Sequence, residues 1–348
     1  MTGGEVLQAG TGNALEDSFE RQRERCEVHA VHLCVAGVVV RLECAREGPA
    51  GVLLPSLQEN RIPVPSGEAD CGIAVWEDAG FFAASPVIGA LRRYRDRVSV
   101  SHQGNRHLFY NPEGEIFCFV DTDLGRAWYC VADRSALPDY EVCTPMRFLL
   151  HWILAARGLI FTHAAGVGRN GRGVLLVGRS GSGKSTTALA CHLNGLEFLG
   201  DDYVAVAPES PARAFHVYRG AKLTDDTLPR FPELARRLHP ANRTQNKNVI
   251  MLSDSDGPIV RSLPVAAVLR PRIAGPGRTT ISPAAPSALL MEMATSTVLQ
   301  AQGGGQHILS GLAALCRGVP CYDLALGGDF GEISRSIGRF IDSAGARG

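Results

Sequence analysis

The stretch from Gly173 to Leu193 constrains the fold of this chain more than any other part of the sequence. Gly173–Val177 is an apolar run typical of a buried strand, and Gly178–Ser185 reads GRSGSGKS. A helix-forming run, Thr186–Leu193, follows and stops at Asn194-Gly195. The loop fits G-x-x-x-x-G-K-[ST] in full, and its flanking strand and helix are the context in which this pattern forms a phosphate-binding loop, the Walker A motif.

Each part of this loop has a physical role in binding phosphate. The glycines allow backbone N–H groups to turn inward, and the helix N-terminus adds its partial positive charge. Lys184 is expected to reach the β- and γ-phosphates of a nucleotide, and the Ser185 hydroxyl to ligate Mg²⁺. The sequence therefore predicts a site for ATP with Mg²⁺, formed by Gly178, Ser180, Gly181, Ser182, Gly183, Lys184, Ser185 and Thr186.

Two adjacent carboxylates follow the next apolar run. Leu196–Val204 reads LEFLGDDYV, which places Asp201 and Asp202 at the end of a short strand. Ligands collect at the carboxyl ends of strands in doubly wound sheets, so both aspartates would face the phosphate loop if the two strands are neighbours. Phosphoryl transfer needs one carboxylate near the metal and one group that accepts a proton, and this pair can divide these roles. The alternative is a solvated turn.

His163 lies where an apolar strand meets the small residues of FTHAAGV, Phe161–Val167. A single histidine in such surroundings is more often a satisfied core residue than a catalytic one. Both interpretations stay open on the residues alone.

Composition excludes several classes of protein. The 348 residues include 35 basic and 35 acidic side chains, so no net charge attracts nucleic acid or an anionic membrane. The most apolar stretch, 148–167, contains His151, Arg157 and His163, and the first residues lack the pattern of a secretory signal. None of the ten cysteines forms a CxxC pair, which is typical of small buried side chains in a reducing cytoplasm.

The chain is long enough for two domains. Residues 1–27 are polar and glycine-rich, which predicts a flexible N-terminus. From 28 to 143, short apolar runs separated by turn residues predict a mostly antiparallel β-rich accessory domain, with a hairpin turn at Asn111–Glu115. A helix over 146–157, capped by Thr144, opens a region of alternating strands and helices. The predicted α/β domain with the phosphate loop therefore spans 144–348.

Three elements together resemble a known family: Thr162–Gly166 (THAAG), the phosphate loop fifteen residues after His163, and Gly200-Asp201-Asp202. They are similar to the HPr kinase/phosphorylase superfamily, and more closely to HPr-kinase-like enzymes of peptide-modification clusters, including lasso-peptide kinases. The resemblance covers about residues 145–345 and implies a P-loop fold related to phosphoenolpyruvate carboxykinase. It implies a cytoplasmic, ATP- and Mg²⁺-dependent kinase, and relatives of this type are oligomeric, so a homo-oligomer is possible.

The resemblance also implies roles for single residues. Lys184 and Ser185 would bind phosphate and Mg²⁺, Asp201 would be the base for the acceptor hydroxyl, His163 would tune that base, and Asp202 would hold the metal. The chain departs from the HPr enzymes at Thr186, where they carry an acidic residue, and at Arg179, where they carry an aspartate. Residues 28–142 also do not match their N-terminal domain. These departures indicate an acceptor other than HPr.

The expected function is transfer of the γ-phosphoryl group of ATP to a Ser or Thr hydroxyl of a peptide or protein. Three alternatives stay open: a kinase of a small-molecule hydroxyl, a nucleotide-dependent regulatory ATPase or binding module, and, less favoured, a carboxykinase-like enzyme. Six further basic residues are candidates for binding phosphate or acceptor: Arg219, Lys222, Lys247, Arg261, Arg270 and Arg272.

Overall fold

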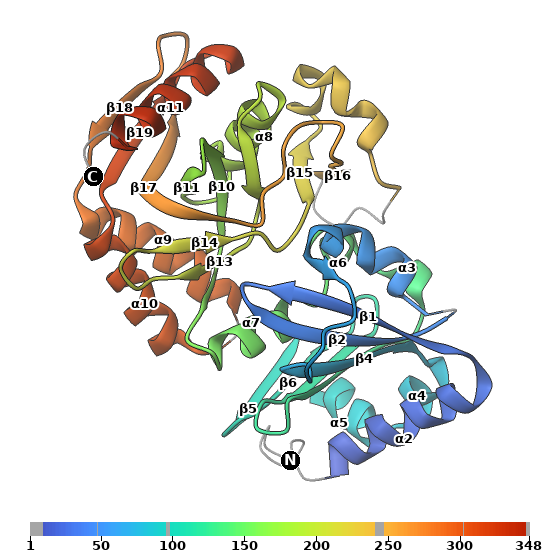
Figure 1. Ribbon diagram of the computed structural model, residues 1–348. Coiled ribbons are helices and arrows are strands. Elements are labelled where there is room, and N and C mark those ends of the chain that lie inside the picture. Colours follow the sequence, from blue (N-terminus) through green and yellow to red (C-terminus); the bar gives the residue numbers. More distant parts are fainter. Residues whose placement is uncertain (1–9, 47, 95–97, 241–246, 302, 346–348) are drawn as a thin grey trace. The chain divides into compact units, whose positions relative to one another are not determined.

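The computed structural model describes residues 10–46, 48–94, 98–240, 247–301 and 303–345. The described residues up to Ala156 form one compact unit, and those from Arg157 onward form a second (Figure 1). The sequence predicted a boundary at 143/144, whereas helix α7 (Arg147–Ala155) belongs to the first unit. The reason is packing, since Phe148 of α7 stacks on Phe109 with ring centroids 4.1 Å apart.

Within the described residues, the first unit is built on an eight-stranded sheet in the order β3-β1-β2-β4-β8-β7-β6-β5. Its strands are β1 (Val28–Val35), β2 (Val38–Ala45), β3 (Arg61–Ile62), β4 (Cys71–Glu77), β5 (Ser99–Gln103), β6 (Arg106–Asn111), β7 (Ile116–Asp121) and β8 (Arg126–Val131). The predicted turn after Asn111 does join the antiparallel strands β6 and β7. The sheet is mixed rather than mostly antiparallel at its centre, because β4 pairs in parallel with both β2 and β8.

Helices accompany this sheet: α2 (Gly10–Arg25), α3 (Ala50–Leu53), α4 (Ala79–Ala84), α5 (Pro86–Tyr94), α6 (Asp139–Cys143) and α7. The predicted flexible N-terminus is wrong for residues 10–25, and residues 1–9 lie outside the described part of the chain. Leu15 and Phe19 of α2 are fully buried in the core that contains Trp76. Helix α2 is therefore docked by two buried apolar side chains together with polar contacts, in which the indole N–H groups of Trp76 and Trp128 donate to Ser18 and Glu16.

The second unit contains a nine-stranded sheet among its described residues, ordered β12-β10-β11-β17-β14-β13-β9, with β19 pairing β17 and β18 pairing β19. The strands are β9 (Ile160–Thr162), β10 (Ala164–Arg169), β11 (Arg172–Val177), β12 (Glu197–Gly200), β13 (Val204–Ala207), β14 (Arg213–Phe215), β17 (Ser262–Ile273), β18 (Thr280–Pro283) and β19 (Cys321–Leu326). A separate ribbon pairs β15 (Gly220–Thr224) with β16 (Lys247–Met251).

Helices cover both faces of this sheet (Figure 1). On one face, α8 (Lys184–Leu193) and α11 (Phe330–Gly345) share a core with Val174 and Leu176 of β11. On the other, α9 (Pro286–Ala301) and α10 (Gly305–Gly318) share a core with Leu175 and Val177. Alternate residues of β11 thus point into the two cores, as the pleat of a strand requires. The mixed α/β character predicted for this region is confirmed.

In the described part of the chain, no helix combines the length and apolar character needed to cross a membrane. Eight of the ten cysteines are buried, and all ten carry free thiols. Burial raises the pKa of several of these thiols, among them Cys44 and Cys191, each to about 12. Such thiols are unreactive at neutral pH, which fits the role of small apolar side chains.

Candidate functional site

The residues of the candidate site lie together at one edge of the sheet because of the direction of strand β10. Strand β10 lies between β11 and β12 and runs antiparallel to both. The start of β10 therefore meets the carboxyl ends of its two neighbours. This places His163, which precedes β10, beside the loop that follows β11 and the aspartates that follow β12. The aspartates were expected to face the loop if β11 and β12 were neighbours, but β10 lies between these two strands and the three segments still converge.

The phosphate loop connects β11 to α8, as the sequence predicts. Gly178, Gly181 and Gly183 have φ angles of 154°, 80° and 102°. The φ angle of Gly183 lies in the left-handed region, where a residue with a side chain would be strained. The loop backbone is thus shaped by its glycines to present N–H groups at the start of a helix.

The side chain of Lys184 contacts the first residue of this loop. Its Nζ atom donates a hydrogen bond to the carbonyl oxygen of Gly178 at 2.6 Å, and the residue is 6% exposed. Burial lowers the pKa of Lys184, and the carboxylates of Asp201 and Asp202 act against that shift. An ammonium group held this way is set beside the loop where the phosphates of a nucleotide would lie.

A cavity of about 230 Å³, here called the phosphate-loop cavity, opens over the loop. Its lining includes Lys184, Ser185 and Thr186 from the loop and the helix start, together with His163 and Asp202. Two lysines of the β15–β16 ribbon, Lys222 and Lys247, complete its basic lining. The predicted loop residues, the histidine and one of the two aspartates therefore meet in one space.

Asp202 is the aspartate that lines this cavity. It adopts a left-handed conformation with φ 64°, which aspartate tolerates better than most residues. Its Oδ1 lies 3.4 Å from Nε2 of His163, and its Oδ2 lies 3.2 Å from Nζ of Lys222. Although burial acts in the other direction, Lys222 and His163 hold the pKa of Asp202 well below its usual range.

Asp201 is fully buried and faces the start of α8 instead. Its Oδ2 accepts a hydrogen bond from the backbone N–H of Lys222 at 3.3 Å, while Oδ1 has no hydrogen-bond partner among the described residues. Burial and then the charge of Asp202 raise the pKa of Asp201 to about 6, and the neighbouring Ser185 hydroxyl opposes this. The buried Asp201 carboxylate and the half-buried Ser185 hydroxyl are thus neighbours.

The donors at Asp201 and Ser185 fit Mg²⁺. This ion prefers carboxylate and hydroxyl oxygens, and usually takes one or two protein ligands together with phosphate oxygens and waters. The Asp201 carboxylate and the Ser185 hydroxyl form such a ligand pair. Oδ1 of this carboxylate has no hydrogen-bond partner among the described residues. Within the described residues there is no cluster of three or more His, Cys, Asp or Glu side chains suited to an all-protein metal site.

His163 is 7% exposed, and contacts of its backbone and of its ring hold it in place. Its N–H donates to Oγ1 of the buried Thr297 at 3.3 Å, and its ring packs at 5.5 Å from that of Tyr203. Burial lowers the pKa of His163, with Asp202 opposing that effect, so the ring is neutral at pH 7. A neutral imidazole whose Nε2 carries the proton donates to Asp202 and fixes the position of that carboxylate.

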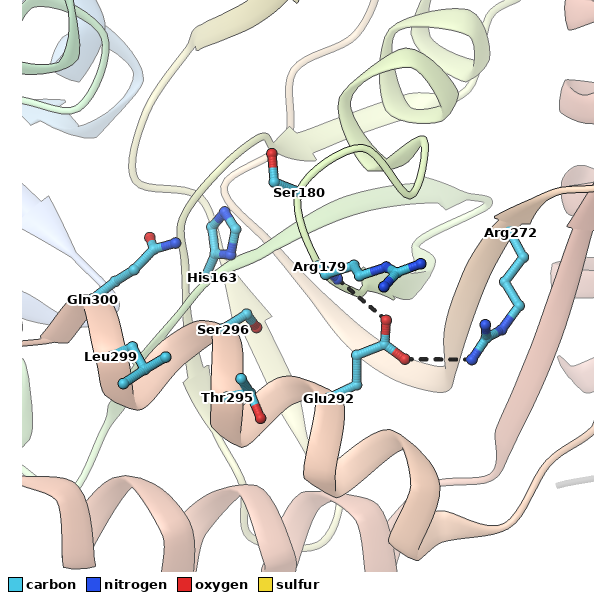
Figure 2. A pocket seen from close by; sticks show the side chains of 9 residues that line it. All are labelled: His163, Arg179, Ser180, Arg272, Glu292, Thr295, Ser296, Leu299 and Gln300. Atoms are coloured by element: carbon cyan, nitrogen blue, oxygen red, sulfur yellow. Dashed lines mark hydrogen bonds and ion pairs between the residues drawn. The ribbon is translucent and has the colours of Figure 1, made fainter. Parts of the chain in front are cut away.

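A second and larger cavity, of about 470 Å³, adjoins the first and is here called the α9 cavity (Figure 2). It shares His163, Arg179 and Ser180 with the phosphate-loop cavity. Figure 2 shows helix α9 along one side, from Glu292 to Gln300. The hydroxyl of Tyr203 donates to Oε1 of Gln300 and so ties this end of α9 to the segment that carries Asp202.

Glu292 of α9 contacts the start of the phosphate loop. Its Oε1 accepts the backbone N–H of Arg179 at 3.2 Å (Figure 2). Its Oε2 lies 3.5 Å from Arg270 and 3.7 Å from Arg272, both on β17. Arg270 also donates to Asp323 at 2.7 Å. This chain of charges connects strands β17 and β19 to the loop through one carboxylate.

The basic candidates from the sequence divide into two groups. Lys222, Lys247 and Arg272 line the cavities, whereas Arg219 pairs with Asp254 at 3.2 Å and Arg261 lines neither. The sequence pattern did not identify Glu292, Thr297 and Gln300. These three residues lie on helix α9, at least ninety positions after the aspartates, and no local motif marks them.

No known protein-family profile matches this chain, and no curated protein matches it. Among solved structures the chain is similar to the HPr(Ser) kinase/phosphatase from Coxiella burnetii, with 11% sequence identity and a TM-score of 0.30. The match covers 54% of this chain and 97% of that chain. At this level of similarity, the activity of that protein does not transfer to this chain.

Proposed function

We propose that this protein is an ATP- and Mg²⁺-dependent phosphotransferase of the HPr-kinase-like type, whose acceptor is a Ser or Thr hydroxyl of a peptide or protein. One observation carries this proposal. The carboxylate of Asp202 lines the same cavity as Lys184 and Ser185 of the phosphate loop, and His163 and Lys222 fix its position.

The nucleotide is held by the loop backbone from Gly178 to Gly183 and by Lys184. Ser185 and Asp201 would hold Mg²⁺, because the buried Asp201 carboxylate has an oxygen without a hydrogen-bond partner among the described residues and interacts with the Ser185 hydroxyl, whereas the Asp202 carboxylate contacts His163 and Lys222. When bound, Mg²⁺ neutralises charge on the phosphates and orients them. Lys222 and Lys247 of the β15–β16 ribbon add positive charge to the lining of the cavity.

Asp202 is the base in this proposal. The acceptor oxygen attacks the γ-phosphorus, a new P–O bond forms, and the bond between the γ-phosphorus and the β,γ-bridging oxygen breaks, so that ADP leaves. The acceptor proton passes to an oxygen of Asp202. His163 and Lys222 keep this carboxylate ionised and oriented, and such positioning supplies much of the catalysis in phosphoryl transfer.

These roles exchange those that the resemblance implied for the two aspartates. Asp201 is the buried residue beside Ser185, and Asp202 is the residue that reaches the cavity and the histidine. The contacts therefore favour Asp201 as the metal ligand and Asp202 as the base.

A direct test is incubation of the protein with γ-labelled ATP, Mg²⁺ and a mixture of capped Ser- and Thr-containing peptides. Label on a peptide hydroxyl, located by mass spectrometry, supports the proposal. Release of inorganic phosphate with no labelled peptide at any protein concentration contradicts it and favours the regulatory ATPase. A parallel reaction with Lys184→Met identifies label that does not depend on the phosphate loop.

A further inference from the structure

The α9 cavity is large enough for part of an acceptor. Its volume of about 470 Å³ lies within the ordinary range for ligand pockets, about 300–1,000 Å³. It adjoins the phosphate-loop cavity, and His163, Arg179 and Ser180 belong to both. A molecule that fills the α9 cavity can therefore present an atom past His163 to Asp202, while a nucleotide occupies the phosphate loop.

The two ends of this cavity differ in chemistry (Figure 2). His163 and Gln300 lie at one end, near the proposed base. At the other end, Arg179 and Arg272 lie on either side of Glu292. Between these ends α9 contributes Thr295, Ser296 and Leu299. A ligand that spans the cavity thus has one end at the reacting group and the other among guanidinium groups.

The charges at the far end favour an anion. Two arginines and one glutamate line the cavity, which leaves an excess of one positive charge with His163 neutral. Next to Glu292, Arg270 and Asp323 form an ion pair at 2.7 Å and contribute one charge of each sign, so they leave this excess unchanged. Arg272 lies 3.7 Å from Glu292 and 3.8 Å from Asp323, beyond normal hydrogen-bond length, and its side chain is 56% exposed. Its donors are therefore available to a carboxylate, which a guanidinium binds through two hydrogen bonds.

Arg179 adds to this binding capacity. Its side chain is exposed, and no ion pair of its guanidinium group occurs within the described residues. The backbone N–H of Arg179 donates a hydrogen bond to Glu292. This bond fixes the position from which the Arg179 side chain leaves the main chain.

Exposed apolar side chains on α9 point to a polypeptide rather than a small molecule. Leu299 is 72% exposed and Met291 is 68% exposed, and both lie on the helix that lines the cavity. With Thr295 they are spaced four residues apart, so they follow one side of the helix. Large exposed apolar side chains beside a polar pocket are typical of a surface that contacts another chain.

We propose that the α9 cavity binds an acidic peptide segment, whose Asp or Glu carboxylate pairs with Arg272 and Arg179 while its Ser or Thr hydroxyl reaches Asp202. This inference rests on the proposed function and adds the charge preference of the acceptor. Apolar residues of the same segment contact Leu299 and Met291 at the rim.

The test uses capped peptides with one Ser and a single variable residue, Asp, Ala or Lys, placed at each of three positions on either side of it. Phosphorylation is measured with labelled ATP as kcat/KM. We expect Asp at one or two positions to raise kcat/KM about tenfold over Ala, and Lys to lower it. Tenfold corresponds to about 1.4 kcal/mol, the scale of one charge-assisted hydrogen bond.

Reversing the charge of Arg272 distinguishes recognition of the charge on the peptide from a general structural effect on activity. In Arg272→Glu the preference should invert, so that the Lys peptide becomes the better substrate at saturating ATP. The matched control Arg317→Glu reverses an exposed arginine that lines neither cavity, and should keep the wild-type preference. An equal loss on the Asp, Ala and Lys peptides in Arg272→Glu, or no charge preference in the wild type, overturns this inference.

The Ala peptides distinguish this inference from the proposed function. If they are phosphorylated without any effect of charge, only the acidic-peptide inference fails. If neither they nor any charged peptide is phosphorylated by the wild-type protein, while Lys184-dependent release of phosphate persists, the phosphotransferase proposal fails with it.

Discussion

Nε2 of His163 lies 3.4 Å from Oδ1 of Asp202, although 39 positions separate the two residues in the sequence. Strand pairing explains this proximity. Thr162 of β9 pairs with Val204 of β13 in antiparallel register, so the residues next to this pair, His163 and Tyr203, lie at the same end. The left-handed conformation of Asp202 then turns its carboxylate toward the ring. Backbone strain of this kind is concentrated at functional sites.

Replacement of Asp202 by Asn should remove the base and leave the nucleotide site intact. We expect transfer to fall by about 10²–10⁴-fold, the usual contribution of a general base, while ATP affinity changes little. Single-turnover transfer of label and calorimetric titration with ATP measure the two effects. Asp254→Asn, at a side chain that is 86% exposed, is the control. Wild-type transfer rates in Asp202→Asn would remove Asp202 from the proposed mechanism.

Replacement of Asp201 by Asn should instead act on the metal. The proposal assigns Asp201 and Ser185 to Mg²⁺, so Asp201→Asn and Ser185→Ala should each raise the Mg²⁺ concentration for half-maximal activity about tenfold or more, a loss of at least about 1.4 kcal/mol of binding. Asp202→Asn should leave this concentration unchanged in its residual activity. If the Mg²⁺ dependence shifts in Asp202→Asn and not in Asp201→Asn, the two roles are the reverse of those proposed.

Glu292 should position the phosphate loop for the nucleotide. Glu292→Ala removes the acceptor of the Arg179 N–H, so we expect the KM for ATP to rise about tenfold, with a smaller change in kcat. Glu292→Gln keeps a carbonyl oxygen that accepts this hydrogen bond and should restore most of the affinity. Steady-state kinetics over ATP concentration gives the two constants. Glu209→Ala, at an exposed side chain, is the control, and equal defects in Ala and Gln variants would contradict a role through this hydrogen bond.

Helix α2 should contribute strongly to the stability of the first unit. Phe19 is fully buried and its ring lies 5.4 Å from that of Trp76. Phe19→Ala should therefore lower the free energy of unfolding of this unit by about 3–5 kcal/mol, whereas the exposed Arg21→Ala should change it by less than about 0.5 kcal/mol. Urea denaturation followed by tryptophan fluorescence measures both. An unchanged transition in Phe19→Ala would mean that α2 is not docked in solution.

The stability of the first unit should depend on pH through His107. This ring stacks on Trp152 at 5.2 Å, and burial, followed by the charge of His102, lowers the pKa of His107 to about 4 from its ordinary 6.5. Between these values the unfolded chain binds a proton that the folded unit does not, so stability falls as pH falls from about 6.5 to about 4. His107→Phe keeps the stacking and should flatten this part of the curve of melting temperature against pH. Parallel curves for wild type and variant would contradict the lowered pKa.

The sequence by itself determined the phosphate loop and its flanking elements. Strand β11, the loop and helix α8 lie where the sequence predicts them, because glycine conformation, a buried apolar run and helix-forming residues act over a few neighbouring positions. For the same reason the sequence identified the hairpin turn after Asn111. The local sequence pattern was misleading for residues 10–25, where two buried apolar side chains and hydrogen bonds from two tryptophans dock a mostly polar helix on a sheet.

Only the tertiary structure decided which side chains lie next to the phosphate loop and which way each of them points. The antiparallel strand β10 brings His163 to the carboxyl ends of β11 and β12, and the backbone of Asp202 separates two adjacent carboxylates into one that faces Ser185 and one that faces the cavity. Glu292 reaches the loop from a helix that no motif marks. Strand register and the direction of side chains depend on partners far away in the sequence. Patterns among neighbouring residues therefore do not determine them.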